Sequence, residues 1–139
     1  MTEHFKPPTE AIIKDVLAVI KFDDRGLVPA IAQDDESGKV LMMAWMDSEA
    51  IKETLKTGTA CYYSRSRSKL WRKGEESGQT QTIKDFRVDC DGDTVLIVVK
   101  QQGVACHTGR HSCFFKSING DGIQVVEEVL INPDTLYKK

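Results

Sequence analysis

The sequence predicts an α+β fold with a mainly antiparallel β-sheet and a few short helices. Several short runs rich in Val, Ile, Thr and Tyr are separated by turn residues, and two segments repeat apolar residues at helical spacing. Short turns between consecutive strands favour hairpins, which pair antiparallel. The length of 139 residues suits one core. We therefore expect a single domain over residues 1–139, with residues 1–8 flexible.

The first predicted elements are a helix and a hairpin. Apolar residues at helical spacing predict a helix over residues 9–20, and Thr9 is a suitable N-cap. Two β-rich runs predict strands over residues 28–33 and 40–45. The polar residues 36–39 between them predict a turn.

A second helix follows the hairpin. Asp47 or Ser48 is expected to cap it, and Gly58 is a typical residue just after a helix. Its predicted buried face consists of Ala50, Ile51, Thr54 and Leu55. Residues 60–64 then predict a strand, in which Cys61 is expected to be a core residue.

The second half of the chain predicts four more strands. Residues 82–90 and 94–100 are two of them, and the Asp-Gly pair between them is a strong hairpin signal. Residues 112–118 and 124–130 are the other two, although a helix is an alternative for the last segment. The polar, basic residues 65–80 predict a loop.

Composition excludes some classes of protein. The net charge of −2 predicts neither nucleic-acid nor membrane partners. No apolar run approaches the roughly 20 residues of a membrane helix, and the N-terminus lacks the apolar centre of a signal peptide. We expect a cytoplasmic protein whose four cysteines stay reduced. A thiol redox protein would need a C-x-x-C motif, and this chain has none.

Residues 89–93 hold three closely spaced carboxylates, Asp89, Asp91 and Asp93. On a strand they would share one side, and they would repel one another unless a cation neutralised them. Oxygen ligands suit Mg²⁺. An EF-hand would need glycine and glutamate where Thr94 and Lys100 stand, so that motif is excluded. A solvated acidic turn is the alternative.

Three further cysteines are candidate zinc ligands: Cys90, Cys106 and Cys113. Three thiolates are the minimum protein shell of a catalytic zinc ion, which keeps a fourth position open for water. His107 is adjacent to Cys106, and we expect it to act as a general acid/base near the metal rather than as a ligand. Three unconnected buried cysteines are the alternative.

Cations and hydroxyl groups are concentrated in the predicted loop and just before it. Arginine and serine side chains bind phosphate through charge-assisted hydrogen bonds. The candidate substrate-binding residues are Ser64, Arg65, Ser66, Arg67, Lys69, Trp71 and Arg72. Trp71 would stack on a base or pack beneath the loop. A solvated loop and an RNA-contacting Arg-Ser patch are alternatives.

Together these segments resemble the phosphoribosyl-AMP cyclohydrolases, the ring-opening enzymes of histidine biosynthesis. The resemblance covers residues 26–115. It is carried by the runs LMMAWM, YYSRSRSKLWRKGEESGQTQ and DCDGD, and by Cys106-His107 through Cys113-Phe114-Phe115. It implies hydrolysis of the N1–C6 bond of the adenine ring in 1-(5-phosphoribosyl)-AMP, a small-molecule nucleotide.

The resemblance also implies an assembly and its metals. The family forms an intertwined homodimer with one Zn²⁺ per subunit at the dimer interface and with cysteines from both chains. Carried over by position, Cys90, Cys106 and Cys113 would bind zinc. Asp89, Asp91 and Asp93 would bind magnesium.

Two other functions compete with this interpretation. A non-catalytic zinc-binding module would contact RNA through the Arg-Ser loop. A zinc nucleotide deaminase would release ammonia, but its H-x-E…P-C-x-x-C signature is absent from this sequence.

Overall fold

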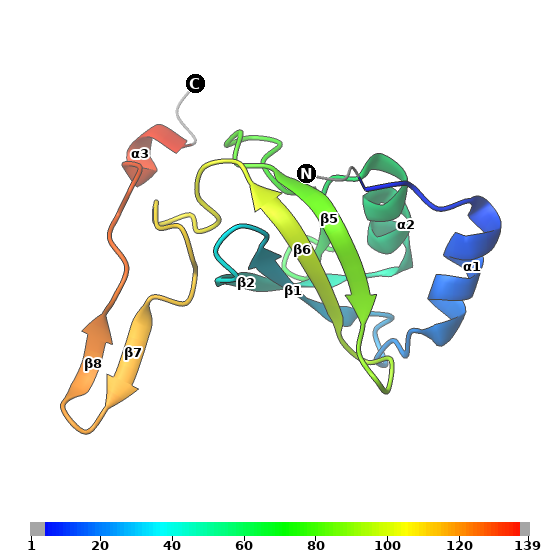
Figure 1. Ribbon diagram of the computed structural model, residues 1–139, viewed down its shortest axis with the longest axis horizontal. Helices are drawn as coiled ribbons and strands as arrows, with labels where there is room; N and C mark the ends of the chain where they lie inside the picture. The colour runs from blue at the N-terminus through cyan, green and yellow to red at the C-terminus, as the bar shows by residue number, and fades with distance from the viewer. Residues whose placement is uncertain (1–4, 137–139) are drawn as a thin grey trace.

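A six-stranded sheet organises the protein, which a computed structural model describes over residues 5–136 (Figure 1). Residues 1–4 of the N-terminal segment expected to be flexible lie outside the described part. The strands are β1 (Val28–Asp34), β2 (Val40–Met46), β3 (Cys61–Ser64), β4 (Lys69–Arg72), β5 (Gln81–Val88) and β6 (Val95–Gln101). Their order is β4-β3-β2-β1-β6-β5, and only β1 and β6 pair in parallel. The predicted α+β class with a mainly antiparallel sheet is confirmed.

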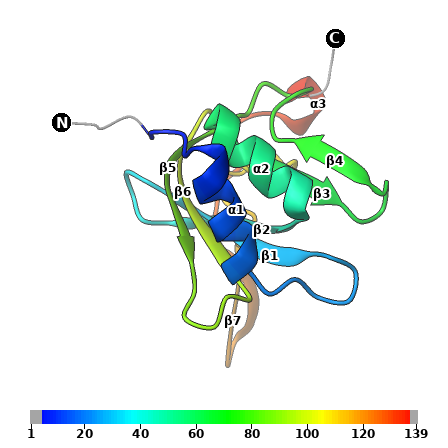
Figure 2. The same cartoon turned by 90° about the vertical axis from the view of Figure 1, so that its right-hand side faces the viewer.

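Two capped helices cover one side of this sheet (Figure 2). α1 (Glu10–Val19) begins after Thr9, whose hydroxyl accepts a hydrogen bond from the Ile12 N–H at 3.3 Å. α2 (Ser48–Thr57) begins after Asp47, whose carboxylate accepts from the Ala50 N–H at 2.7 Å. It ends at Gly58 with φ +74°, a conformation that glycine adopts without strain. Both predicted helices and their caps are confirmed.

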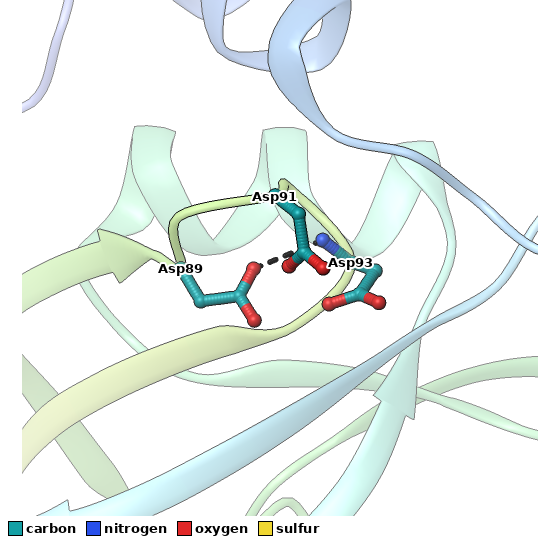
Figure 3. A group of neighbouring side chains, drawn as sticks. All are labelled: Asp89, Asp91 and Asp93. Atoms are coloured by element: carbon teal, nitrogen blue, oxygen red, sulfur yellow. Dashed lines mark hydrogen bonds between the residues drawn. The ribbon is translucent and has the colours of Figure 1, made fainter.

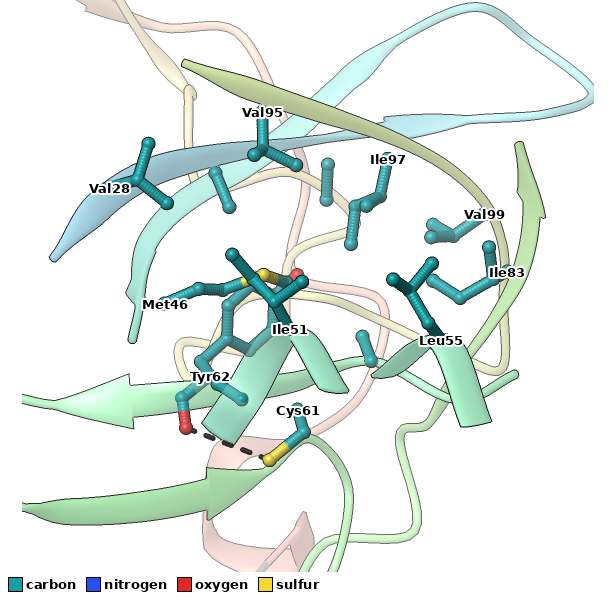
Figure 4. Packing of buried hydrophobic residues seen from close by; sticks show 14 of the residues in the cluster. Val28, Met46, Ile51, Leu55, Cys61, Tyr62, Ile83, Val95, Ile97 and Val99 are labelled. Carbon is teal, nitrogen blue, oxygen red and sulfur yellow. Dashed lines mark hydrogen bonds between the residues drawn. The ribbon is translucent and has the colours of Figure 1, made fainter. Parts of the chain in front are cut away.

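The core lies between the sheet and α2 (Figure 4). Alternate side chains of β1 and β6 are buried, as expected for strands with one covered face. The predicted α2 face of Ala50, Ile51, Thr54 and Leu55 is fully buried, and Cys61 is a core residue with 1% of its surface exposed.

The segment predicted as a loop contains a strand. β4 (Lys69–Arg72) pairs antiparallel with β3, which places Trp71 opposite Tyr62. The two rings lie 5.4 Å apart between centroids. The loop prediction was wrong here. Only two apolar residues occur among many charges in this segment, so its pattern does not indicate a strand. The strand depends on the packing of Trp71 against Tyr62 of β3.

The C-terminal strands are shorter than predicted. β7 (Lys116–Asn119) and β8 (Gly122–Val125) form a separate hairpin, and α3 (Pro133–Leu136) follows. Residues 112–115 and 126–130 are not strands. The Ser112 hydroxyl bonds to the Val40 carbonyl at 2.7 Å, and it accepts from the Phe114 N–H at 2.9 Å. These bonds give the backbone an alternative to a sheet ladder.

The β7–β8 hairpin extends away from the body of the molecule (Figure 1). All eight of its strand residues are exposed. Within residues 5–136, no helix combines the length and apolar character required to cross a membrane.

Candidate metal and nucleotide site

The three aspartates meet in the turn between β5 and β6 (Figure 3). Ligand oxygens of Asp89, Asp91 and Asp93 all lie within 4.8 Å of one another, and all three residues are exposed. Asp89 accepts hydrogen bonds from the backbone N–H groups of Asp93 and Thr94, at 3.0 and 3.2 Å. The sequence predicted this cluster, and its oxygen-only donor set suits a hard cation.

The turn is held against the end of α1. The Lys21 N–H donates to the Gly92 carbonyl at 2.7 Å. Gly92 has φ +80°, and a Cβ at this position would collide with the carbonyl oxygen of Val19. Glycine is therefore required at this position of the acidic turn.

The carboxylates of the turn influence one another. Hydrogen bonding to Asp91 and then to Asp89 raises the pKa of Asp93. Desolvation opposes ionisation of Asp89, but hydrogen bonds from Asp93 and from backbone N–H groups lower its pKa on balance. A shared proton or a cation relieves this crowding.

Two cysteine thiols meet at the other end of β6. Cys106 lies in a tight turn, where its carbonyl accepts from the Gly109 N–H at 3.0 Å and its sulfur from the Thr108 hydroxyl at 3.1 Å. The Cys113 N–H donates to the Leu41 carbonyl at 2.7 Å. Cys113 is an exposed residue, but partial desolvation of its thiol and the neighbouring Cys106 thiol raise the pKa of Cys113 to about 12. Two of the three candidate sulfur ligands thus lie side by side.

Cys90 does not join this pair within one chain. It follows β5 in the acidic turn, whereas Cys106 and Cys113 lie beyond the opposite end of β6. The seven residues of β6 alone span about 20 Å, at roughly 3.3 Å per residue. Within residues 5–136, the aspartate trio is the only group of three or more candidate ligands close enough to share an ion. The described part of one chain therefore does not bring the predicted sulfur trio together.

His107 is exposed although its neighbour Cys106 is buried. His107 is therefore open to solvent next to Cys106 in the sequence, and it stays a candidate acid/base.

A cavity of about 980 Å³ opens over β4 and the following turns. Six of the seven predicted substrate-binding residues line it: Ser64, Ser66, Arg67, Lys69, Trp71 and Arg72. Arg65 does not, because its guanidinium lies over the Trp45 ring at 4.7 Å from the centroid. The Arg72 guanidinium binds Glu53 of α2 through contacts of 2.7 and 2.8 Å, so its charge is already paired.

Sequence reasoning missed Lys73, which also lines the cavity. Only 5% of its surface is exposed, which is unusual for lysine. Its ammonium lies 5.8 Å from the centre of the Trp71 ring. Burial lowers the pKa of Lys73, while the thiols of Cys113 and Cys106 act in the opposite direction. Lys73 is therefore a buried cation in the cavity wall.

A buried polar network joins the cavity wall to the turn of Cys106. Gln81 accepts from the Tyr62 hydroxyl at 2.6 Å and donates to Gln101 at 2.9 Å. Gln79 accepts from the Val104 N–H at 2.8 Å, two residues before Cys106. These bonds fix the approach of the chain to Cys106.

Comparison with known proteins agrees with the family resemblance of the sequence. The family model for phosphoribosyl-AMP cyclohydrolase matches residues 42–115. A protein of that name from Alkalilimnicola ehrlichii is 55% identical over 99% of this chain and 96% of its own length. Another from Paramagnetospirillum magneticum is 60% identical over 89% of this chain and 94% of its own. A third, from Granulibacter bethesdensis, is 59% identical over 90% and 98%.

Gly103→Ala should disturb the turn that carries Cys106. Gly103 has φ +69°, and a Cβ there would collide with the Gln79 side chain that holds Val104. We expect a loss of about 1–3 kcal/mol in unfolding free energy, measured by urea titration. Gly26→Ala is the matched control, because Gly26 has φ +76° but open space around it. Equal losses in both variants would contradict a specific role for the Gln79 contact.

Proposed function

This chain belongs to the phosphoribosyl-AMP cyclohydrolase family of hydrolases, and we propose that it opens the adenine ring of 1-(5-phosphoribosyl)-AMP. Water would add its oxygen to C6 and a proton to N1, and the N1–C6 bond would break. The product is the ring-opened, formimino-type aminoimidazole carboxamide ribonucleotide, and the step belongs to histidine biosynthesis. The observation that carries the proposal, beside the family, is the cavity whose lining includes the unpaired cations Arg67 and Lys69 and the hydroxyls of Ser64 and Ser66.

The cavity supplies groups for the two substrate phosphates. Arg67 and Lys69 line it without an ion pair among residues 5–136. The Ser64 and Ser66 hydroxyls lie 3.3 Å apart on the same wall. Arg72 has a different task in this proposal, because its paired guanidinium ties β4 to α2 and so fixes the cavity wall.

The thiol pair would supply two of the three sulfur ligands of a zinc site. Cys106 and Cys113 would hold the ion together with Cys90 of a second copy, because β6 keeps their own Cys90 at the far end of the sheet. Zinc bound there would supply a water molecule of lowered pKa. This arrangement gives one zinc ion per subunit at the interface of a homodimer.

An exposed apolar surface supports the second copy. It surrounds the β7–β8 hairpin, which extends away from its own domain (Figure 1). Its residues are Phe114, Ile118, Ile123, Val125, Val126, Val129 and Leu130, each between 48% and 72% exposed. Apolar surface of this extent typically marks a protein interface. We propose that this hairpin arm packs on the partner chain.

His107 would transfer the protons of the reaction. It is exposed beside Cys106, so its imidazole can take a proton from the attacking water and return one to N1. The adjacent cavity would hold the nucleotide so that C6 faces the thiol pair.

The aspartate turn would hold Mg²⁺, which supplies positive charge for a substrate phosphate. Cys90 lies within this turn. In the proposed dimer, the aspartate cluster of one chain therefore lies beside the thiol pair and cavity of the other.

Substrate turnover tests the proposed reaction directly. With 1-(5-phosphoribosyl)-AMP, we expect an absorbance change from ring opening, no ammonia release, and loss of activity with a zinc chelator. His107→Ala should lower kcat by about 10²–10⁴-fold with zinc retained. Ammonia release would indicate a deaminase instead. An unchanged absorbance with salt-sensitive RNA binding would indicate the zinc-binding module.

Subunit complementation tests the shared zinc site. Cys90→Ala and Cys106→Ala should each be inactive alone, because each lacks one sulfur at every site. Refolded as a mixture, they should recover about a quarter of the wild-type activity, since half of the dimers would contain one intact site of two. A mixture of Cys106→Ala with Cys113→Ala is the control and should stay inactive, because these residues belong to the same half-site. No recovery in the first mixture would contradict the shared site.

Magnesium binding should depend on pH. Neighbouring carboxylates raise the pKa of Asp93, so the free energy of unfolding of the metal-free protein falls as pH rises through that pKa. Mg²⁺ should therefore raise the melting temperature at neutral pH, and the increase should shrink as pH falls and protons replace the ion. Asp91→Asn should lose most of the increase, whereas the exposed Asp24→Asn should keep it. Equal responses of the two variants would refute the site.

A further inference from the structure

One buried cation in the cavity wall, Lys73, has no counter-charge in the described part of the chain. The residue lines the cavity, yet only 5% of its surface is exposed. No carboxylate of residues 5–136 forms an ion pair with it. Its backbone N–H donates to the Ala60 carbonyl at 3.2 Å, which fixes the residue just after β4. Because burial of an unpaired charge is costly, this lysine points to an anion that comes from outside the chain.

The other cations that line the cavity differ from Lys73. Arg72 is already paired with Glu53 at 2.7 Å, and Arg67 and Lys69 are exposed residues. Exposed charges are screened by water and salt, and they lose side-chain entropy when they hold a ligand. A buried ammonium is screened less, and the fold has already fixed its backbone. Lys73 is therefore the cation of this cavity that is best placed to hold an anion firmly.

Lys73 also lies beside an aromatic surface. Its ammonium is 5.8 Å from the centre of the Trp71 ring, and this ring lies 5.4 Å from the Tyr62 ring between centroids. Trp71 is 37% exposed and lines the same cavity. An anion held by Lys73 would thus lie next to a ring on which a base can stack. A phosphate joined to a flat heterocycle, as in a nucleoside monophosphate, matches this pair of residues.

We propose that Lys73 is a substrate-binding residue whose buried ammonium binds a phosphate of the nucleotide beside Trp71. The inference rests on the proposed function, because it assumes that the cavity holds the nucleotide. The phosphate supplies the counter-charge that the described chain lacks, and its oxygens accept charge-assisted hydrogen bonds from the ammonium. The exposed Arg67 and Lys69 then contribute less to phosphate affinity than Lys73 does.

Binding of AMP and of adenosine to the full chain, measured by isothermal titration calorimetry, tests this role. The two ligands share base and ribose and differ only in the phosphate, so the wild type should bind AMP more tightly. Lys73→Met should weaken AMP binding by about 10–100-fold, the usual effect of losing a hydrogen bond between charged groups. Adenosine binding should not change. Lys73→Arg should recover part of the preference for AMP, because it restores the charge.

Two matched controls also remove one positive charge each. Lys69→Met removes an exposed cation of the same cavity, and it should weaken AMP binding by about fivefold at most. Lys100→Met removes an exposed cation of β6 that does not line the cavity, and it should bind both ligands as the wild type does. An equal loss of AMP affinity in Lys69→Met and Lys73→Met would overturn the assignment to the buried cation.

Thermal unfolding without nucleotide separates phosphate binding from a structural role. Lys73→Met should melt at or above the wild-type temperature, because an apolar chain of similar shape replaces a buried charge. A lower melting temperature, together with equal losses of AMP and adenosine affinity, would identify a structural lysine and refute the proposal. If Lys73→Met fails to fold, Lys73→Gln carries the same expectations for binding and for melting.

The outcomes distinguish the two levels of inference. If the wild type turns over 1-(5-phosphoribosyl)-AMP and Lys73→Met keeps the preference for AMP over adenosine, the role of Lys73 is wrong and the proposed function stands. The same holds if the wild type turns over this substrate but shows no preference for AMP. A wild type that neither turns over the substrate nor binds AMP would overturn the proposed function, and the role of Lys73 with it.

Discussion

The length and rigidity of the β5–β6 hairpin constrain the whole site. Its ladder of backbone hydrogen bonds fixes Cys90 at one end of β6, and Cys106 and Cys113 follow the other end of that strand. A local rearrangement cannot bring the three sulfurs together, because that would break a central strand of the core. The zinc site that we propose therefore draws its three sulfurs from two chains. The exposed apolar residues of the hairpin arm are the surface that we propose for the second chain.

A second constraint lies around the cavity, where the fold buries polar side chains. Lys73 lines the cavity although it is only 5% exposed, and Gln81 of β5 bonds to Tyr62 and Gln101 inside the protein. All four residues of β4 line the cavity, so this short strand is the main support of its wall. This explains why so much polar sequence surrounds a strand of four residues.

Local chemistry made much of the fold predictable. Thr9 and Asp47 cap their helices, and the Asp-Gly turn between β5 and β6 brings the three aspartates together. Features that depend on distant contacts were not predictable. β4 exists because Trp71 packs on Tyr62 across a hairpin, and the burial of Lys73 depends on the surrounding tertiary structure. Sequence spacing alone also gave no sign that Arg72 would pair with Glu53, nineteen positions away. The family resemblance, rather than spacing, indicated that ligands come from two chains.

Diffraction from crystals of the purified protein at the zinc absorption edge tests the central claim most directly. The account predicts one anomalous peak per chain, bound by Cys106 and Cys113 of one subunit and by Cys90 of the other. Anomalous density enclosed by a single chain would contradict it, as would a zinc-loaded monomer with Cys90 far from the ion.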